Sequence, residues 1–280
     1  MQRISSLAEL DLWKGRLHGK TLGFVPTMGA LHKGHLSLVN MSLERGAKTL
    51  VSIYVNPTQF DNPEDLVKYP NTLEKDLELL EAMGCDAVFL PTDEMLYPEG
   101  LESRAFSFGF LGLHMEGAGR PGHFEGMATV VTKFFELIQP DFAIFGEKDY
   151  QQLCIIRRVV VEENWPVKIV AGPVVREADG LAMSSRNLRM SEVERTEAAS
   201  IYEVLSKACA EAERFDGVAE LKDYCVETLN AVPSLSVEYI ECCDEKALQP
   251  VRELDPKTPT RLFAAVQCGN VRLIDNLPLF

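Results

Sequence analysis

Phe24-Val25-Pro26-Thr27-Met28-Gly29-Ala30-Leu31-His32-Lys33-Gly34-His35 is the stretch around which the rest of the chain is organised. Thr21 to Val25 predicts a short buried strand, and Pro26 to Gly29 predicts a turn. His35 to Gly46 predicts a helix, because Leu36, Val39 and Leu43 fall on one helical face. We therefore expect a strand, a loop and a helix N-terminus in succession.

This junction suits a phosphate group. The first N–H groups of a helix lack intrahelical partners, and the helix dipole places partial positive charge beside them. The imidazoles of His32 and His35 can donate to phosphoryl oxygens, and the glycines let the backbone approach a ligand closely. The stretch lacks both the glycine-rich dinucleotide fingerprint and the P-loop ending, so neither of those sites is favoured. A metal-binding pair and two unrelated surface histidines remain alternatives.

The composition is that of an ordinary globular protein, with 280 residues of which 46% are hydrophobic and 25% are charged. That length allows one large domain or two unequal ones. The formal net charge of −14 argues against a nucleic-acid partner, which would need a basic field. An anionic substrate must therefore meet a local positive pocket, and the candidate side chains are His32, Lys33, His35, Arg120, His123, Lys148, Arg176 and Arg186.

The chain shows no export or membrane signal. Its N-terminus lacks the apolar core of a signal peptide, and no segment reaches the roughly 18 to 20 apolar residues that span a bilayer. We therefore expect a cytoplasmic protein with no membrane partner. Seven cysteines without a CxxC pair favour reduced core residues over a zinc site or a disulfide framework.

Residues 49–55 predict a second buried strand, separated from the first by a helix. Two such strands form a βαβ unit and hence a parallel sheet, whose ligands gather at the carboxyl ends of the strands. Asn56 and Gln59 follow this strand and could bind hydroxyls or a carboxylate. For Asn56, which precedes Pro57, capping of its own turn is an equal alternative.

The next segments predict more of the same sheet. Residues 61–68 predict a polar loop, 72–83 a helix and 86–90 a third strand. In that helix Glu74 and Asp76 could hold a magnesium–phosphate complex, although a solvated helix face is the more usual explanation. The glycine-rich residues 92–123, which end near Arg120 and His123, predict a loop over a site.

A helix over 127–138 and a buried strand over 142–145 lead into Gly146-Glu147-Lys148-Asp149. Lys148 suits a phosphate there, and Asp149 or the Gly146 backbone suits ribose hydroxyls, with a salt-bridged surface turn as the alternative. A helix over 150–163 and a strand over 167–170 follow. In the segment 176–187 the serines and Arg186 could grip a polyphosphate, with helix capping as the competing explanation.

The character of the chain changes from Ser191 onward. Charged amphipathic helices over 191–213 and 216–230 precede strands over 237–241, 261–266 and 271–274. We therefore predict the α/β class, with a Rossmann-like parallel-sheet domain over 1–173 and a smaller C-terminal α+β domain over 174–280.

Five motifs together resemble the pantothenate synthetase (pantoate–β-alanine ligase) family. They stand in the family's order at residues 26–35, 55–60, 119–124, 146–152 and 176–187. The resemblance implies a domain of the same superfamily as the class I aminoacyl-tRNA synthetases. It also implies a cytoplasmic homodimer that uses ATP and Mg²⁺ to join pantoate to β-alanine through a pantoyl adenylate, on the route to coenzyme A.

Carried over residue by residue, the resemblance implies an ATP site at Met28, Gly29, Ala30, Leu31, His32, Lys33, Gly34, His35, Gly146, Glu147, Lys148, Asp149, Val175, Met183, Ser184, Ser185 and Arg186. It makes His35 the proton donor, with His32, Lys148, Ser184, Ser185 and Arg186 as further catalytic residues. It gives Gln59 and Gln152 to pantoate, and we add Asn56, Arg120 and His123 as substrate contacts and Asp76 as a metal ligand.

Two departures from the family pattern are visible. Asp61 stands where the family has glycine, and Glu74-Lys75-Asp76 replaces the usual pair of acidic residues. Three rival functions remain: a nucleotidyltransferase of the same superfamily, a metal-dependent hydrolase that uses both histidines as ligands, and a non-catalytic nucleotide-binding regulator. A hydrolase would need a third ligand at suitable spacing, and the sequence offers none that is convincing.

Overall fold

The computed structural model describes residues 1–61 and 63–280, and the chain divides into two compact units. The first unit comprises Met1–Glu147 and Gln152–Pro173, and the second comprises Lys148–Gln151 and Val174–Phe280. The chain therefore crosses between the units three times. The short segment Lys148–Gln151 groups with the C-terminal part of the chain, although it lies within the N-terminal part of the sequence.

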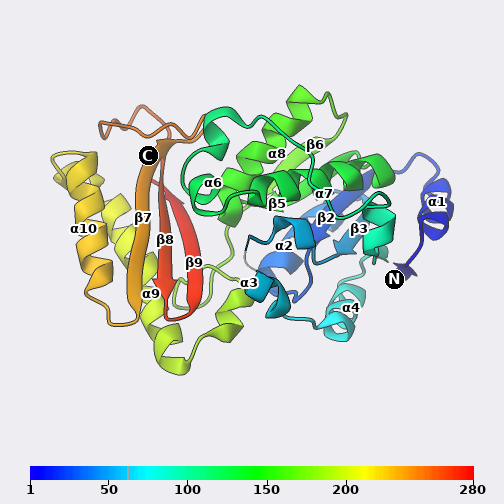
Figure 1. The fold of residues 1–280 in the computed structure, drawn as a ribbon, viewed down its shortest axis with the longest axis horizontal. Helices are drawn as coiled ribbons and strands as arrows, with labels where there is room; N and C mark the ends of the chain where they lie inside the picture. Colours follow the sequence, from blue (N-terminus) through cyan, green and yellow to red (C-terminus); the bar gives the residue numbers. More distant parts are fainter. Residues whose placement is uncertain (62) are drawn as a thin grey trace. The chain divides into compact units, whose positions relative to one another are not determined.

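The first unit is built on a six-stranded parallel sheet in the order β1-β4-β3-β2-β5-β6 (Figure 1). The strands are β1 (Gln2–Ile4), β2 (Leu22–Thr27), β3 (Lys48–Ile53), β4 (Ala87–Phe89), β5 (Phe142–Gly146) and β6 (Lys168–Gly172). The chain moves outward from β2 on one side through β3 to β4 and on the other side through β5 to β6. Ligands of such sheets gather where the order reverses, outside the carboxyl ends of β2 and β5.

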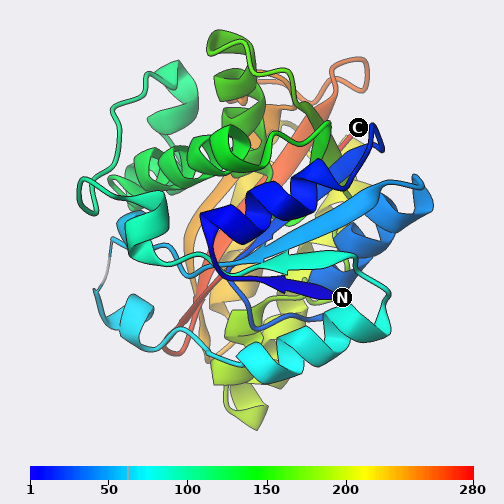
Figure 2. The same ribbon diagram turned by 90° about the vertical axis from the view of Figure 1, so that its right-hand side faces the viewer.

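The helices of the first unit cover both faces of this sheet. They are α1 (Leu7–Gly15), α2 (Lys33–Glu44), α3 (Pro63–Val67), α4 (Leu73–Ala82), α5 (Asp93–Leu96), α6 (Glu116–Gly119), α7 (His123–Ile138) and α8 (Tyr150–Glu162), of which Tyr150 and Gln151 group with the second unit. Helices α1 and α7 lie on one face, and α2 and α4 lie on the other (Figure 2). Right-handed crossovers running in opposite directions along the sheet give this arrangement.

The second unit has a three-stranded antiparallel sheet in the order β7-β8-β9. Its strands are β7 (Leu235–Asp244), β8 (Thr260–Cys268) and β9 (Val271–Pro278), and its helices are α9 (Glu192–Ala210) and α10 (Val218–Asn230). The apolar residues of α9 and α10 and of the sheet form one buried cluster, which includes Ile201, Leu221 and Leu262. The predicted α/β class is confirmed, with a Rossmann-like sheet and a smaller C-terminal sheet of the antiparallel kind.

Two local predictions were wrong, and a third is confirmed in part. Residues 61–68, predicted as a loop, contain α3. Residues 92–123 are irregular over most of their length, as a loop should be, but they contain α5, α6 and the 3₁₀ turn η2 (Gly109–Gly112). In that segment Phe108, Leu111 and Met115 are buried, so it is packed against the unit rather than loose. Pro26 and Thr27 belong to β2 rather than to the turn after it.

Burial of the cysteines agrees with the prediction of core thiols. All seven are free, and six of them are buried. Within the described residues, no helix is both long enough and apolar enough to cross a bilayer.

Candidate active site

The histidine motif forms the N-terminus of α2, the first element after β2. His32 is the N-cap residue, and its Nδ1 atom accepts from the Gly34 N–H at 3.2 Å. The Nδ1 atom of His35 accepts from the His32 N–H at 3.4 Å, so the two rings form a reciprocal capping box. Because Nδ1 accepts in both neutral rings, each ring carries its proton on Nε2.

The loop before the histidines is held by Asp76 from helix α4. Its two carboxylate oxygens accept from the Ala30 and Leu31 N–H groups, both at 2.8 Å, and Oδ1 also accepts from the Thr72 hydroxyl at 3.1 Å. The Asp76 residue is 1% exposed, and Ala30 has a left-handed φ of 49°. The carboxylate therefore stabilises a strained backbone whose N–H groups would otherwise be buried without acceptors.

The amide motif after β3 contacts the methionine of the histidine loop. Gln59 lies in the 3₁₀ turn η1 (Pro57–Gln59), where its Nε2 atom is 2.8 Å from the Met28 sulfur and its Oε1 atom accepts from Asn56 at 3.2 Å. Asn56 is 1% exposed, and it also donates to the Gly126 carbonyl at 3.1 Å and accepts from the Tyr97 hydroxyl at 2.7 Å. Its amide thus ties the end of β3 to α7.

Arg120 and His123 join the same group. The Nδ1 atom of His123 donates to the Gln59 carbonyl at 2.7 Å, since a carbonyl can only accept. In the neutral ring Nε2 then accepts from the Arg120 guanidinium at 3.0 Å, and Arg120 also lies 3.4 Å from Asp61. The structure therefore brings together four sequence-predicted residues, namely Asn56, Gln59, Arg120 and His123, with Met28 beside them.

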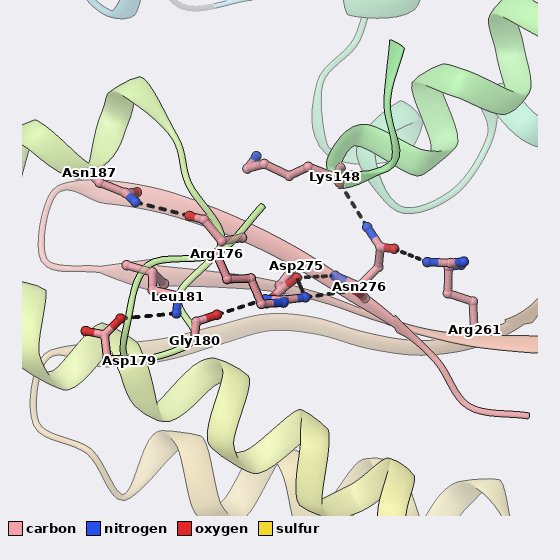
Figure 3. A network of polar contacts seen from close by, with 10 residues as sticks. Lys148, Arg176, Asp179, Gly180, Leu181, Asn187, Arg261, Asp275 and Asn276 are labelled. Carbon is pink, nitrogen blue, oxygen red and sulfur yellow. Dashed lines mark hydrogen bonds and ion pairs between the residues drawn. The ribbon is translucent and has the colours of Figure 1, made fainter. Parts of the chain in front are cut away.

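Of the other predicted phosphate-binding residues, the second unit contains Lys148, Asp149 and the segment 175–187, whereas Gly146 and Glu147 belong to the first unit. Lys148 and Asp149 lie in the 3₁₀ turn η3 (Glu147–Asp149) after β5, and the Lys148 ammonium is 3.8 Å from the Asp149 carboxylate. Its side chain is 21% exposed, so it remains accessible to an anion. In Figure 3 the Lys148 carbonyl faces the C-terminal sheet, whereas its ammonium extends away from the network. Gln152 lies in the first turn of α8, in the first unit, and is half-buried.

Residues 175–183 form a tight hairpin, and the 3₁₀ turn η4 (Ser185–Arg189) follows it. Met183 donates its N–H to the Val175 carbonyl at 3.0 Å, and Arg176 bridges to Ala182. The Ser184 hydroxyl accepts from the Arg186 N–H at 3.3 Å, so the helix-capping alternative is observed for this serine. The cap fixes Ser184, Ser185 and Arg186 in one compact turn.

The described part of the chain offers no ready-made metal site beside these residues. Among residues 1–61 and 63–280, no cluster of three or more His, Cys, Asp or Glu side chains could hold a metal ion. Asp76, the predicted ligand, is buried and already accepts three hydrogen bonds. The present side chains therefore do not fit an all-protein magnesium site.

Sequence reasoning missed residues that hold the candidate site in place. Gly126 is one, because a Cβ atom there would overlap the Thr58 carbonyl and lie 2.7 Å from the Gln59 nitrogen. Tyr97, Asp275 and Asn276 are others. No local pattern marks them, since their partners are distant in the sequence.

Comparison with known proteins identifies the family to which the chain belongs. Residues 2–278 match the family model described as Pantoate-beta-alanine ligase. The protein named pantothenate synthetase from Bacteroides fragilis (strain YCH46) is 47% identical over 270 residues, which cover 96% of this chain and 94% of that protein.

Two solved structures are similar along the whole chain. Pantothenate synthetase from Thermus thermophilus superposes with a TM-score of 0.93 at 42% identity and covers 100% of both chains. Pantoate-beta-alanine ligase from Francisella tularensis, complexed with beta-gamma ATP and beta-alanine, has a TM-score of 0.85 at 34% identity and covers 100% of this chain and 98% of that one. The chain therefore belongs to the pantoate–β-alanine ligase family.

Proposed function

We propose that this chain is an ATP-dependent ligase that condenses pantoate with β-alanine to give pantothenate, AMP and pyrophosphate. In the first step an oxygen of the pantoate carboxylate attacks the α-phosphorus of ATP, and pyrophosphate leaves. In the second step the amine of β-alanine attacks the acyl carbon of the adenylate, the C–O bond to AMP breaks, and the amine loses a proton. The product would feed coenzyme A synthesis.

The observation that carries this proposal is the histidine capping box at the start of α2. Each ring accepts a backbone N–H at Nδ1, so each carries its proton on Nε2, where it could donate to a phosphate oxygen. Two neutral donors beside the positive end of a helix dipole suit phosphate oxygens on which negative charge grows as pyrophosphate leaves. We propose that His35 is the main donor and that His32 binds the phosphates.

We propose that the rest of the ATP site is formed by Met28 to Gly34, by Gly146 to Asp149, by Val175 and by Met183 to Arg186. Lys148 and Arg186 carry the positive charge that a polyphosphate needs in a chain of net charge −14. Family membership of the whole chain and the compact turn at Ser184 to Arg186 support this assignment.

For pantoate we propose Gln59 and Gln152, with Arg120 and His123 beside Gln59. A buried amide at the carboxyl end of the sheet suits a hydroxy acid, since it can donate and accept. Asn56 would act on the substrate by fixing the Gln59 amide, to which it donates at 3.2 Å.

We propose that magnesium enters with the phosphates of ATP, because the ion usually keeps several waters and few protein ligands. None of the steps above is routed through it. We also propose a homodimer in the cytoplasm. The resemblance supports the dimer, and seven free thiols suit a reducing compartment.

The test is AMP and pyrophosphate release from ATP and Mg²⁺, with pantoate and β-alanine added separately and together. We expect amide and AMP only when both substrates are present. We expect His35→Ala to lower the rate by roughly 10² or more, as for loss of a transition-state donor. His18→Ala, at an exposed histidine of the first unit, is the matched control. ATP binding without AMP release in any combination would overturn the ligase assignment. A stable dinucleotide-like product with a phosphate acceptor would instead indicate a nucleotidyltransferase.

A further inference from the structure

We propose that Asp275 and Asn276, adjacent residues of the last strand β9, are positioning residues that brace both ATP-binding segments of the second unit. Asp275 holds the hairpin that leads to Met183–Arg186, and Asn276 holds Lys148 (Figure 3). This inference rests on the proposed function, because the two segments matter to the reaction only if they bind ATP. It assigns a role to a strand in which the sequence shows no motif.

The Asn276 amide is the link to Lys148. Its Nδ2 atom donates to the Lys148 carbonyl at 2.9 Å, and its Oδ1 atom accepts from the Arg261 guanidinium at 2.7 Å. Asn276 is 2% exposed and Arg261 is 6% exposed. The amide is therefore oriented by a buried cation on one side and fixes the lysine backbone on the other.

Arg261 also holds the residue that begins α8. Its guanidinium carbon lies 4.1 Å from the centroid of the Tyr150 ring, and its Nε atom donates to the Glu245 carboxylate at 3.1 Å. The Tyr150 hydroxyl donates to the Glu245 carbonyl at 3.2 Å. The segment Lys148–Gln151 is thus fixed at its first and third residues by the C-terminal sheet.

Asp275 is the link to the hairpin. Two guanidinium nitrogens of Arg176 donate to its two carboxylate oxygens, at 2.6 and 2.9 Å, in a bidentate ion pair. Arg176 also donates to the Gly180 carbonyl at 3.0 Å, and its guanidinium carbon lies 4.2 Å from the centroid of the Tyr202 ring. The side chains of Asp275 and Arg176 are 2% and 16% exposed, so solvent screens this pair weakly.

Because Asp275 and Asn276 are consecutive residues of β9, the hairpin and the segment Lys148–Gln151 are held by the same short piece of strand. The Asn276 carbonyl accepts from Arg176 at 3.4 Å, and the Asn276 N–H donates to the Asp275 carboxylate at 2.7 Å. A shift of β9 would therefore move Lys148 and the hairpin together. Binding of one polyphosphate by both segments requires that kind of fixed spacing.

The test combines amide hydrogen exchange with binding of a non-hydrolysable ATP analogue. Asn276→Ala and Asn276→Asp both remove the donor to Lys148, and the aspartate keeps an acceptor for Arg261. We expect either change to speed amide hydrogen exchange at residues 148–151. It should also weaken binding of the ATP analogue by about three- to tenfold, as for one lost hydrogen bond. Asp275→Asn should speed exchange at 175–183 first.

A double-mutant cycle separates positioning from general destabilisation. When Lys148→Met is already present, adding Asn276→Ala should weaken analogue binding by less than about twofold further, because Asn276 acts on binding only by positioning Lys148. The KM for ATP should rise while the KM for β-alanine stays within about twofold. Glu238→Gln, which breaks an exposed ion pair to Arg272 on the same sheet, is the control and should change neither readout.

Two results would overturn the inference. They are unchanged exchange at 148–151 in both Asn276 variants, and additive effects of Asn276→Ala and Lys148→Met. Failure of the proposed function looks different. If Lys148→Met binds the analogue and releases AMP like the wild type, the ATP role of Lys148 is wrong. In that case amide hydrogen exchange at residues 148–151 alone decides whether Asn276 holds this segment.

Discussion

Asp76 in the first unit and Asp275 in the second are both buried aspartates that hold a segment of the candidate site, but their donors differ. Asp76 accepts from two backbone N–H groups, at Ala30 and Leu31, whereas Asp275 accepts from the guanidinium of Arg176. Because a backbone N–H is present whatever the side chain, the contact to the histidine loop depends only on the side chain of Asp76. The contact to the hairpin depends on two side chains, those of Asp275 and Arg176. The histidine loop should therefore tolerate side-chain changes at its held residues better than the hairpin does.

The largest expected difference between the two units is in how much unfolding free energy each loses at alkaline pH. Burial raises the pKa of four thiols in the second unit from 9.0 to about 12, namely those of Cys209, Cys225, Cys242 and Cys243. In the first unit burial raises the pKa of Cys85 to the same value. A raised thiol pKa means that stability is intact below pH 9 and is lost as the pH rises from 9 toward 12. At pH 10 the loss is about 1.4 kcal/mol for each such thiol.

The measurement is urea unfolding at pH 8 and pH 10 with a separate readout for each unit. Both tryptophans, Trp13 and Trp165, lie in the first unit, so fluorescence follows that unit alone. Amide exchange follows the second. An equal loss in both units would contradict the difference in thiol burial. The window ends at pH 10, because Tyr54 and Tyr97 of the first unit also have a raised pKa, chiefly from burial.

Asp275→Ala should have the next largest effect. It leaves the Arg176 guanidinium mostly buried without its carboxylate, which costs about 3–5 kcal/mol of unfolding free energy for a buried pair. Chemical denaturation measures the change. A loss below about 1 kcal/mol would show that the pair behaves like an exposed one and would remove the contrast with Asp76.

Asp76→Ala should cost about 2–4 kcal/mol, because the Ala30 and Leu31 N–H groups lose their acceptor. Asp76→Asn keeps one oxygen and should cost about half as much. If the aspartate holds the loop, both changes should also lower kcat/KM for ATP in the proposed reaction. Glu78→Ala, at an exposed position of the same helix, serves as the matched control. A magnesium-dependent defect with unchanged stability would instead favour a metal role.

Gly126→Ala should have the smallest effect on stability, about 1–3 kcal/mol, through overpacking of α7 against η1. The added methyl must push away the Thr58 carbonyl and hence the turn that carries Gln59. We expect the KM for pantoate to rise more than the KM for ATP. Gly15→Ala, where the added methyl meets no atom within 4 Å, is the control. Equal behaviour of the two variants would show that η1 adjusts freely.

The central strands could be read from the sequence, because short apolar runs separated by helical periodicity predict a parallel sheet. The strands around residues 22–27, 48–53, 87–89 and 142–146 all follow that rule. Strand β1 could not be read, because Gln2–Ile4 is short and mostly polar. The sequence predicts a loop where α3 lies, since the five residues of this helix lack an apolar face.

For the candidate site, the sequence predicts the segments that carry the binding residues but not the residues that hold those segments in place. Motifs at the ends of strands marked the histidine loop, Gln59 and Lys148. Nothing local marked the residues that hold them: Asp76 reaches back 45 residues to Leu31, and Asn276 reaches back 128 residues to Lys148. Such contacts leave no periodicity in the sequence. The domain limits at 173 and 174 and the individual roles of the site residues stay predictions.

The grouping of Lys148–Gln151 with the C-terminal residues limits where the chain can be divided. A protein cut after Pro173 would keep Tyr150, which is 7% exposed in the intact chain, but would lose Arg261 and Phe263, against which its ring packs. The C-terminal fragment would in turn leave the Asn276 amide without the Lys148 carbonyl. Fragment exchange between relatives should therefore transfer residues 148–151 together with the C-terminal part of the chain, although the two pieces are separated in the sequence.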